Sequence, residues 1–339
     1  MAYETSSFTW EEFNSGSGIE VADPDDIDVD EFARSEYDLE TASTFGSITS
    51  SVLRHSFENG RRYHKFRHGT YPIPNDDAEQ SRDEMKHVAT LELTNGNLFF
   101  APIGDNPQRI IDLGTGTGSW AIAMADKFPS AQVVGTDLSP IQTPWTPPNL
   151  RFVVDDIEDP WLHGDHFDLV HMRHTSTFIR DIDSVLDRCL AHLRPGGWIE
   201  LQEFGGYAKC DDGSMGPDSP FARFMAMAGD ALATYGFQWR VANCLDEILS
   251  RRGFVNINCK KFKAPLGKWP KNKKLRMVGG MYMIQTACDL MDAMAAKPLK
   301  TVMSEDEVAK LTTAAKAELG CGKSHIYVDY FFWYAQKPS

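Results

Sequence analysis

The sequence predicts an α/β fold in which a mostly parallel sheet is covered by helices on both faces. From residue 107 onward, short apolar strands alternate with amphipathic helices. A glycine-rich loop joins the first of these strands to the first helix. Hydrophobic residues make up 42% and charged residues 24% of the 339 residues, as in ordinary globular proteins. This length is enough for about two domains, or for one large domain with insertions.

Seven apolar segments have the length and composition of buried strands. They are 109–113, 132–137, 150–155, 167–172, 198–203, 254–259 and 326–334. Apolar residues at helical spacing predict the helices between them, at 119–128, 182–193, 222–234 and 241–251. We expect a core at 107–339 with two helical cap insertions, at about 205–250 and 261–325. The second insertion contains six methionines, which are plain core residues or adaptable contacts for a substrate.

Two segments precede this core. Residues 1–40 form an acidic tail, with ten acids and one base between Glu20 and Glu40. We expect the tail to be disordered, and to act as a solubilising segment or as a contact for a partner. Residues 41–106 are predicted to be helical. One helix contains Phe45 and Phe57 and ends at Asn59-Gly60, and a second ends at Asn95-Gly96.

Charge and cysteine usage exclude several classes of protein. The net charge of −14 argues against a general nucleic-acid-binding surface. One basic segment, 260–276, carries eight lysines and arginines, and it is a solvated face or a site for an acidic partner, nucleic acid or the acidic tail. Six cysteines without a CxxC pair indicate reduced intracellular thiols. No secretory signal or membrane-spanning segment is predicted.

The strongest motif is the loop 112–118, Asp-Leu-Gly-Thr-Gly-Thr-Gly, between a predicted strand and a predicted helix. Alternate glycines allow a tight turn and a close approach of the backbone to a ligand. Acids follow the next two strands, at Asp137 and at Asp155-Asp156. A dinucleotide fingerprint would need a glycine at Ser119. An acid at the start of the loop also suits a cationic cofactor better than a pyrophosphate.

This set of motifs resembles the class I S-adenosylmethionine-dependent methyltransferases. The resemblance implies a Rossmann-like, mostly parallel seven-stranded sheet and S-adenosyl-L-methionine as the cofactor. Asp137 and Leu138 would hold the ribose of the cofactor. Asp155, Asp156 and Ile157 would lie beside its adenine. The cofactor residues implied in the loop are Asp112, Gly114, Thr115, Gly116, Thr117 and Gly118.

The flanking residues resemble one branch of this class, the LaeA-like methyltransferases of filamentous fungi. The motifs that carry the resemblance are Tyr63-His64, Gly69-x-Tyr71, Pro74-Asn75-Asp76, Glu79-Gln80-x-Arg82, 135–142 (GTDLSPIQ) and 145–149 (WTPPN). In that family the segment before the core packs over the cofactor. The resemblance therefore places residues 41–106 over the site, with Tyr63 and Tyr71 in the pocket wall.

Methyl transfer from a sulfonium is an in-line displacement, so alignment of the two reactants supplies much of the catalysis. A base is needed only when the acceptor must lose a proton. Candidates lie where the fourth strand ends: Met172 as a cofactor contact, and His174 as an acceptor contact, a base or a structural residue. Glu203, after the fifth strand, is a possible pocket acid or a structural residue. Four histidines at 163–174 invite a zinc hypothesis, but strand alternation disperses them, and no metal is expected.

The sequence therefore predicts an S-adenosylmethionine-dependent methyltransferase. The resemblance favours a regulator of fungal secondary metabolism or development that acts in a complex, with velvet-type proteins or a related methyltransferase as partners. The alternatives are a biosynthetic O- or N-methyltransferase of a small molecule, and a cofactor-binding scaffold with little turnover. The methyl acceptor is a small molecule or a protein. The expected location is cytoplasmic, nuclear or both.

Overall fold

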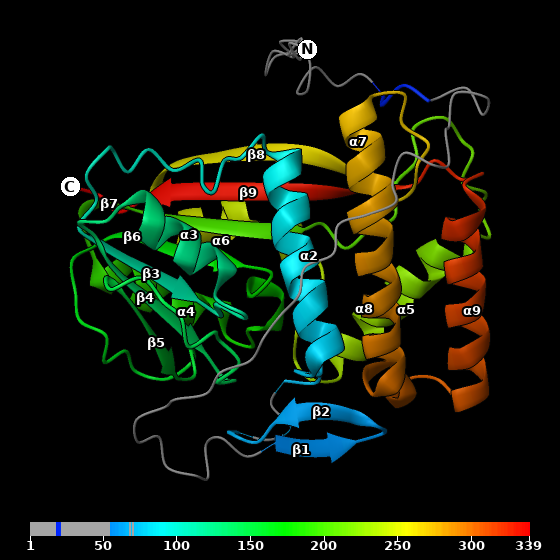
Figure 1. Cartoon of the computed structure of the whole chain (residues 1–339), viewed down its shortest axis with the longest axis horizontal. Helices are drawn as coiled ribbons and strands as arrows, with labels where there is room; N and C mark the ends of the chain where they lie inside the picture. Colours follow the sequence, from blue (N-terminus) through cyan, green and yellow to red (C-terminus); the bar gives the residue numbers. More distant parts are fainter. Residues whose placement is uncertain (1–17, 22–54, 68, 70) are drawn as a thin grey trace.

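The computed structural model in Figure 1 describes residues 18–21, 55–67, 69 and 71–339. The remainder of the acidic tail lies outside the described residues. So do the predicted helical positions from Phe45 to Leu53.

The core is one seven-stranded sheet with the strand order β5-β4-β3-β6-β7-β9-β8. All neighbouring strands are parallel except β9, which runs antiparallel to both β7 and β8. The strands are β3 (Arg109–Leu113), β4 (Gln132–Asp137), β5 (Leu150–Val154), β6 (Phe167–Arg173), β7 (Leu193–Phe204), β8 (Val255–Pro265) and β9 (Tyr327–Gln336). The sheet confirms the predicted fold class, and each predicted strand overlaps an observed one.

Helices cover both faces of the sheet and build a separate layer beside it (Figure 1). The helices and helical turns are α2 (Asp77–Leu93), α3 (Ser119–Lys127), η2 (Ser176–Phe178), α4 (Ile182–His192), α5 (Pro220–Ala233), η3 (Val241–Asn243), α6 (Leu245–Arg251), α7 (Lys273–Met277), the π-helical turn η4 (Val278–Met283), α8 (Ile284–Ala296), η5 (Pro298–Thr301) and α9 (Glu305–Cys321).

Successive residues of the central strands face opposite layers. Ile110 and Val133 are buried with the apolar side of α3 on one face. Ile111 and Val134 are buried on the other face with residues of α4 and α6. Because both faces are covered, the strands are apolar along their whole length, which explains why they could be recognised in the sequence.

The second layer is a helical cap formed by α2, α5, α7, α8 and α9. One apolar cluster joins these helices to β8 and β9 through side chains such as Phe262 and Phe332. The structure places two boundaries of the predicted insertions at other residues. Strand β8 continues to Pro265, so the second insertion begins later than residue 261. Helix α6 belongs to the core and not to the first insertion, because Leu245 and Leu249 are buried against the sheet.

The segment before α2 departs from the predicted helix. Strands β1 (His55–Glu58) and β2 (Arg61–His64) form an antiparallel hairpin. Asn59 and Gly60 have φ values of 49° and 74°, the left-handed conformations that a two-residue hairpin turn requires. The Asn-Gly pair therefore turns a hairpin here and does not end a helix.

The described part of the acidic tail contacts the basic segment 260–276. Val21 forms a β-bridge with Pro270, and the Lys271 amide donates to the Glu20 carbonyl at 2.6 Å. The Lys271 ammonium also lies 3.0 Å from the Glu20 carboxylate. The start of the acidic tail therefore lies against the basic segment at Pro270 and Lys271.

All six cysteines of the chain are free thiols. Among the helices of the described residues, none combines the length and the apolar composition that a bilayer crossing needs.

Candidate functional site

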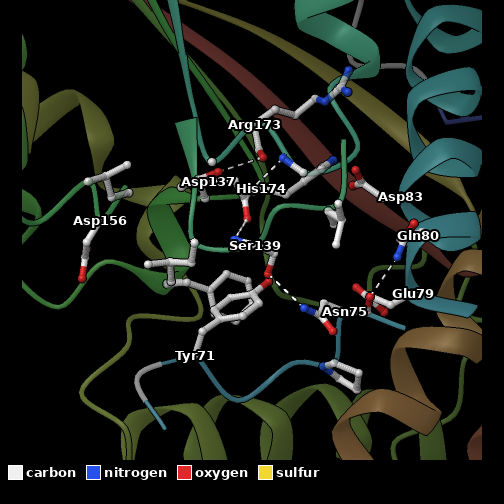
Figure 2. Close-up of a pocket in the computed structure, with 18 of the residues that line it drawn as sticks. Tyr71, Asn75, Glu79, Gln80, Asp83, Asp137, Ser139, Asp156, Arg173 and His174 are labelled. Carbon is white, nitrogen blue, oxygen red and sulfur yellow. Dashed lines mark hydrogen bonds between the residues drawn. The ribbon is translucent and has the colours of Figure 1, made fainter. Parts of the chain in front are cut away.

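A pocket opens at the carboxyl end of the parallel strands, beside the glycine loop and α2 (Figure 2). We call it the loop pocket. The space within its walls, including the part open to solvent, is about 1050 Å³. Of the predicted site residues, it is lined by Tyr71, Gly114, Gly116, Asp137, Leu138, Asp155, Asp156, Ile157 and His174.

The glycine loop is held tightly between β3 and β4. The amide groups of Gly114 and Thr115 both donate to the carbonyl of Thr136 at 2.8 Å. Gly118 has a φ of 87°, and a Cβ there would collide with the ring of Phe152. A side chain at this position would therefore displace the loop or the ring. The loop leads directly into α3, so the helix begins beside the pocket.

Asp137 ends β4 on the pocket wall. Its two carboxylate oxygens accept hydrogen bonds from the amide groups of Gly116 and Ser139, each at 2.9 Å. Burial raises the pKa of Asp137 to about 7, against the opposing effect of these two bonds. The carboxyl is thus fixed in orientation, with further lone pairs available to a ligand that carries hydroxyl groups.

Asp112 lies beneath the loop and not on the wall of the loop pocket. Its carboxylate accepts a hydrogen bond from the Thr115 hydroxyl at 2.6 Å and pairs with His171 Nδ1 at 2.7 Å. The His171 ring stacks on Trp120 with the centroids 3.5 Å apart. Asp112 is 2% exposed, so it anchors the loop to β6 from inside the sheet.

The two acids after β5 line the pocket, and each already has a partner. Asp155 lies 2.7 Å from Nε2 of His163, and Asp156 lies 3.4 Å from Nε of Arg67. With Ile157, they form the edge of the pocket farthest from α2 (Figure 2 shows Asp156).

Charged residues of α2 form the opposite wall, and the site prediction from sequence missed them. Nε of Arg82 donates to the Glu79 carboxylate at 2.9 Å, and the Lys86 ammonium lies 2.9 Å from the Asp83 carboxylate. Asp83 also accepts a bond of 3.3 Å from the Thr117 amide at the start of α3. Figure 2 shows Glu79 and Asp83 facing the strand ends. The detectable signal was a helix before the loop with charged pairs at i, i+3 spacing.

Electrostatics in this wall favour charged side chains despite their burial. Burial raises the pKa of Asp83, but Lys86 outweighs it and holds that pKa well below its usual range. Burial also lowers the pKa of Lys86, with Asp83 opposing. The loop pocket therefore offers both signs of charge to a ligand within a few ångströms of the glycine loop.

A second cavity adjoins the loop pocket and extends into the cap; the space within its walls, including the part open to solvent, is about 850 Å³. We call it the cap chamber. Its walls are mostly apolar and include Phe221, Phe224, Met225, Trp239, Leu266, Met283, Leu290 and Met291. Two methionines of the second insertion, Met283 and Met291, thus line a cavity. The two cavities share five wall residues, Tyr71, Arg82, Lys86, His174 and Phe178.

Two polar groups predicted from sequence reach the cap chamber. His174 stands at the junction with the loop pocket. Glu203 is 2% exposed and lines the chamber, where it accepts a 2.7 Å bond from the Ser176 amide. Burial raises the pKa of Glu203 to about 7. His174 therefore lies where a ligand of the chamber would meet a ligand of the loop pocket, whereas Glu203 lines the chamber alone.

Several predicted cofactor residues lie behind the wall. Met172 is fully buried in the sheet core, with its side chain among those packed against α4. Tyr63 is 2% exposed in the hairpin, beneath the Lys297 ammonium, and does not line the loop pocket. Alternation along β6 turns the Met172 side chain away from the cavity. The loop residues that do not line the pocket are Asp112, Thr115, Thr117 and Gly118.

The histidines of 163–174 do not converge. His163, His171 and His174 each make different contacts, with Asp155, Asp112 and Tyr330 respectively. Within the described residues, no group of three or more histidine, cysteine or acidic side chains could hold a metal ion.

Comparison with known proteins identifies the class of protein to which the chain belongs. A family model described as a methyltransferase domain matches residues 85–258, about half of the chain. The solved structure of Haemonchus contortus phosphoethanolamine N-methyltransferase 2 with S-adenosyl-L-methionine aligns with a TM-score of 0.44 and 18% identity. It covers 75% of this chain and 53% of that chain. The family match and the strand order of the chain's own sheet define the chain as a class I methyltransferase.

Proteins with similar sequences identify the family within this class. Methyltransferase pytC of Aspergillus terreus is 39% identical over 93% of this chain and 97% of its own length. Secondary metabolism regulator LAE1 of Cochliobolus heterostrophus is 34% identical over 83% of this chain and 94% of its own. Protein-methionine methyltransferase laeA of Emericella nidulans is 32% identical over 83% of this chain and 76% of its own. The chain belongs to the LaeA-like methyltransferases, within the class I S-adenosylmethionine-dependent methyltransferases.

Proposed function

We propose that this protein transfers a methyl group from S-adenosyl-L-methionine, bound in the loop pocket, to a small apolar molecule bound in the cap chamber. The observation that carries the proposal is the shared wall of the two cavities, at Tyr71, Lys86 and His174. Reactants that occupy adjoining cavities meet at that wall and are held in a fixed relative orientation. Such alignment supplies much of the rate of a displacement reaction.

The residues of the loop pocket fit the chemistry of this cofactor, which combines a sulfonium, an amine, a carboxylate and a ribose. Asp137 would accept hydrogen bonds from the ribose hydroxyls. Asp155, Asp156 and Ile157 would lie beside the adenine. The wall of α2 offers acids and cations to the charged end of the molecule.

The bound cofactor would supply the electrophilic methyl group. The chain's own residues would bind and orient both reactants and exclude water. Phe224, Met283 and Met291 would surround the apolar body of the acceptor, since aromatic rings and thioethers adapt to such surfaces. His174, which lines both cavities, would contact the acceptor atom.

Isothermal titration calorimetry with S-adenosyl-L-methionine tests the first step. Absence of heat would refute the proposed cofactor. The acceptor class is tested with cofactor that carries a labelled methyl group, incubated with the protein and a fungal extract. Label in an apolar small molecule supports the proposal. Label only on protein would contradict it, and label nowhere would favour the cofactor-binding scaffold.

A second candidate is a regulator of secondary metabolism that acts in a protein complex in the nucleus. Relatives named as secondary metabolism regulators, at 31–34% identity, favour it. Velvet-type proteins are the proposed partners, or a related methyltransferase. Affinity purification of the full chain decides between the candidates: co-purification of nuclear regulators, together with label on protein, would establish the regulatory function.

A further inference from the structure

His174 occupies an unusual place in the backbone. It follows β6 with a φ of 56°, a left-handed conformation that costs a non-glycine residue energy. Its amide donates to the Gln202 carbonyl at 3.0 Å, and its ring stacks on Phe204 with the centroids 4.8 Å apart. These contacts hold the imidazole rigidly at the junction of the loop pocket and the cap chamber.

A chain of hydrogen bonds runs from this imidazole to the backbone of α2. Nε2 of His174 lies 3.2 Å from the Tyr330 hydroxyl, which lies 3.2 Å from the Thr90 hydroxyl. The Thr90 hydroxyl in turn lies 2.8 Å from the carbonyl of Lys86. Tyr330 is 1% exposed and Thr90 3% exposed, so water does not interrupt the chain.

The Lys86 carbonyl, at the end of this chain of hydrogen bonds, determines which group donates in each of them. A carbonyl only accepts, so the single hydroxyl proton of Thr90 is donated to Lys86. Thr90 must then accept from Tyr330, because it has no second proton. Tyr330, having donated its own proton, can only accept from His174. The imidazole therefore carries its proton on Nε2, and Nδ1 is the unprotonated nitrogen.

Resting on the proposed function, we infer that Tyr330 and Thr90 are positioning residues that present the Nδ1 lone pair of His174 to the methyl acceptor, and that the acceptor atom carries an O–H or N–H proton. Nδ1 makes no hydrogen bond to any other described residue, whereas Nε2 is occupied. A lone pair held in this way is matched by a donor on the ligand. An acceptor without a proton, such as a thioether, would leave it unpaired.

The step balances without any other reactant. Nδ1 takes the proton of the acceptor, whose lone pair forms the new bond to the methyl carbon. The carbon–sulfur bond breaks, and its electron pair stays on sulfur as S-adenosylhomocysteine forms. The site loses one positive charge at sulfur and gains one on the imidazole, so its net charge is unchanged. The proton then leaves to solvent.

The surroundings keep the imidazole neutral before the reaction. Burial lowers the pKa of His174 well below its usual value, and the cations Lys86 and Arg173 lower it further, with Asp83 opposing. The lone pair is therefore available throughout the neutral range. The titratable and charged groups that the packed elements bring near the ring or the junction are Arg82, Asp83 and Lys86 on α2, Arg173 on β6, Glu203 on β7 and Tyr330 on β9.

Nitrogen-15 NMR of the histidine-labelled full chain tests the relay without any turnover. Long-range proton–nitrogen spectra distinguish the two tautomers, and His174→Asn assigns the signal. We expect a single Nε2–H tautomer in the unsubstituted protein, and a mixture of tautomers in Tyr330→Phe and in Thr90→Val. The matched control is Tyr327→Phe. Tyr327 lies on β9, as Tyr330 does, and its hydroxyl donates a 2.7 Å bond to Asp211, so its loss should leave the tautomer of His174 unchanged. An Nδ1–H tautomer, or a single Nε2–H tautomer in both relay variants, would overturn the relay.

Two probe compounds test the acceptor class with S-adenosylhomocysteine present. 2-Naphthol has an apolar body with a hydroxyl proton, and 2-methoxynaphthalene lacks that proton. The methyl signals of Met225, Met283 and Met291 report occupancy of the cap chamber. We expect both probes to move these signals and only 2-naphthol to shift Nδ1. Occupancy by both with no shift of Nδ1 would overturn the inference. Failure of either probe to enter would instead contradict the proposed apolar chamber.

Once the labelling experiment has identified an acceptor, the turnover number kcat gives a third test. A positioned base contributes about 10²–10⁴-fold, and loss of the relay should remove part of that, about tenfold in kcat. Cofactor affinity in Tyr330→Phe should stay within about twofold. An unchanged kcat for this variant would refute the positioning role.

Discussion

The removal of one carboxylate, Asp137→Ala, tests the placement of the cofactor most directly. In the free protein the side chain accepts two bonds of 2.9 Å, from the amide groups of Gly116 and Ser139. It has the lone pairs to accept the ribose hydroxyls as well. The substitution removes the charged acceptor and leaves both amide groups without a partner, while the rest of the pocket wall is unchanged.

A hydrogen bond to a charged group contributes about 1.5–3 kcal/mol. At about 1.4 kcal/mol for each factor of ten, the affinity for S-adenosyl-L-methionine should fall by about tenfold to 150-fold. Isothermal titration calorimetry at pH 8 measures it. The control is Asp126→Ala, an exposed acid on α3 outside the pocket, which should leave affinity unchanged.

The pH dependence supplies an independent check. Burial raises the pKa of Asp137 to about 7 in the free protein. The ionised carboxylate is the better acceptor, so ligand binding favours loss of the proton. Affinity should therefore be highest above pH 7 and should fall as the pH drops below 7, by at most tenfold for each unit. The Asp137→Asn variant should lack the part of this pH dependence that comes from ionisation of Asp137. The part that comes from titration of the ligand itself should be the same in the variant and in the unsubstituted protein.

An Asp137→Ala variant with unchanged affinity would refute the ribose site. A pH profile that is the same in the unsubstituted protein and in Asp137→Asn would refute the titration argument. The two results are independent. The first shows whether Asp137 contacts the ribose, and the second shows whether ionisation of its carboxyl strengthens that contact.

Three further substitutions probe the loop, its anchor and the chamber. Gly118→Ala should lower the free energy of unfolding in urea by about 2–5 kcal/mol, because it combines a positive φ with the collision against Phe152. Gly213→Ala, with a positive φ and open space, should cost only about 1–2 kcal/mol, and equal losses would contradict the collision. Asp112→Ala should cost about 2–4 kcal/mol, because two buried partners lose their bonds; a change in cofactor affinity without loss of stability would show that it contacts ligand instead. Ala287→Phe should fill the cap chamber and reduce labelling of the acceptor by about tenfold or more, with cofactor affinity within about twofold; full labelling would place the acceptor elsewhere.

The position of the loop pocket was predictable because its signals are local. Parallel strands that are buried on both faces are apolar runs, and the glycine loop must follow the first of them. Acids at the strand ends, such as Asp137 and Asp155, then meet at one edge of the sheet whatever the rest of the chain does. Tyr71 was placed on the wall by family resemblance and not by its own sequence context.

Predictions from short motifs differed from the structure where one motif occurs in two kinds of structure. Asn59-Gly60 ends helices and also turns hairpins, and the strand pairing from His55 to His64 decides for the hairpin. Asp112 has the sequence context of a ligand-binding acid. Its environment is decided by His171, which is 59 residues away in the chain.

The order of the strands along the chain, the loop and the acids of the pocket edge could be predicted from the amino-acid sequence alone, because periodicity and turn chemistry act over a few residues. Three features required the folded structure: the charged side chains with which α2 closes the pocket, the apolar chamber that the cap leaves, and the contacts of Tyr330 with His174 and Thr90. These last contacts join residues 156 and 240 positions apart. Contacts at such separations depend on how whole layers pack, and no local pattern of side chains encodes them.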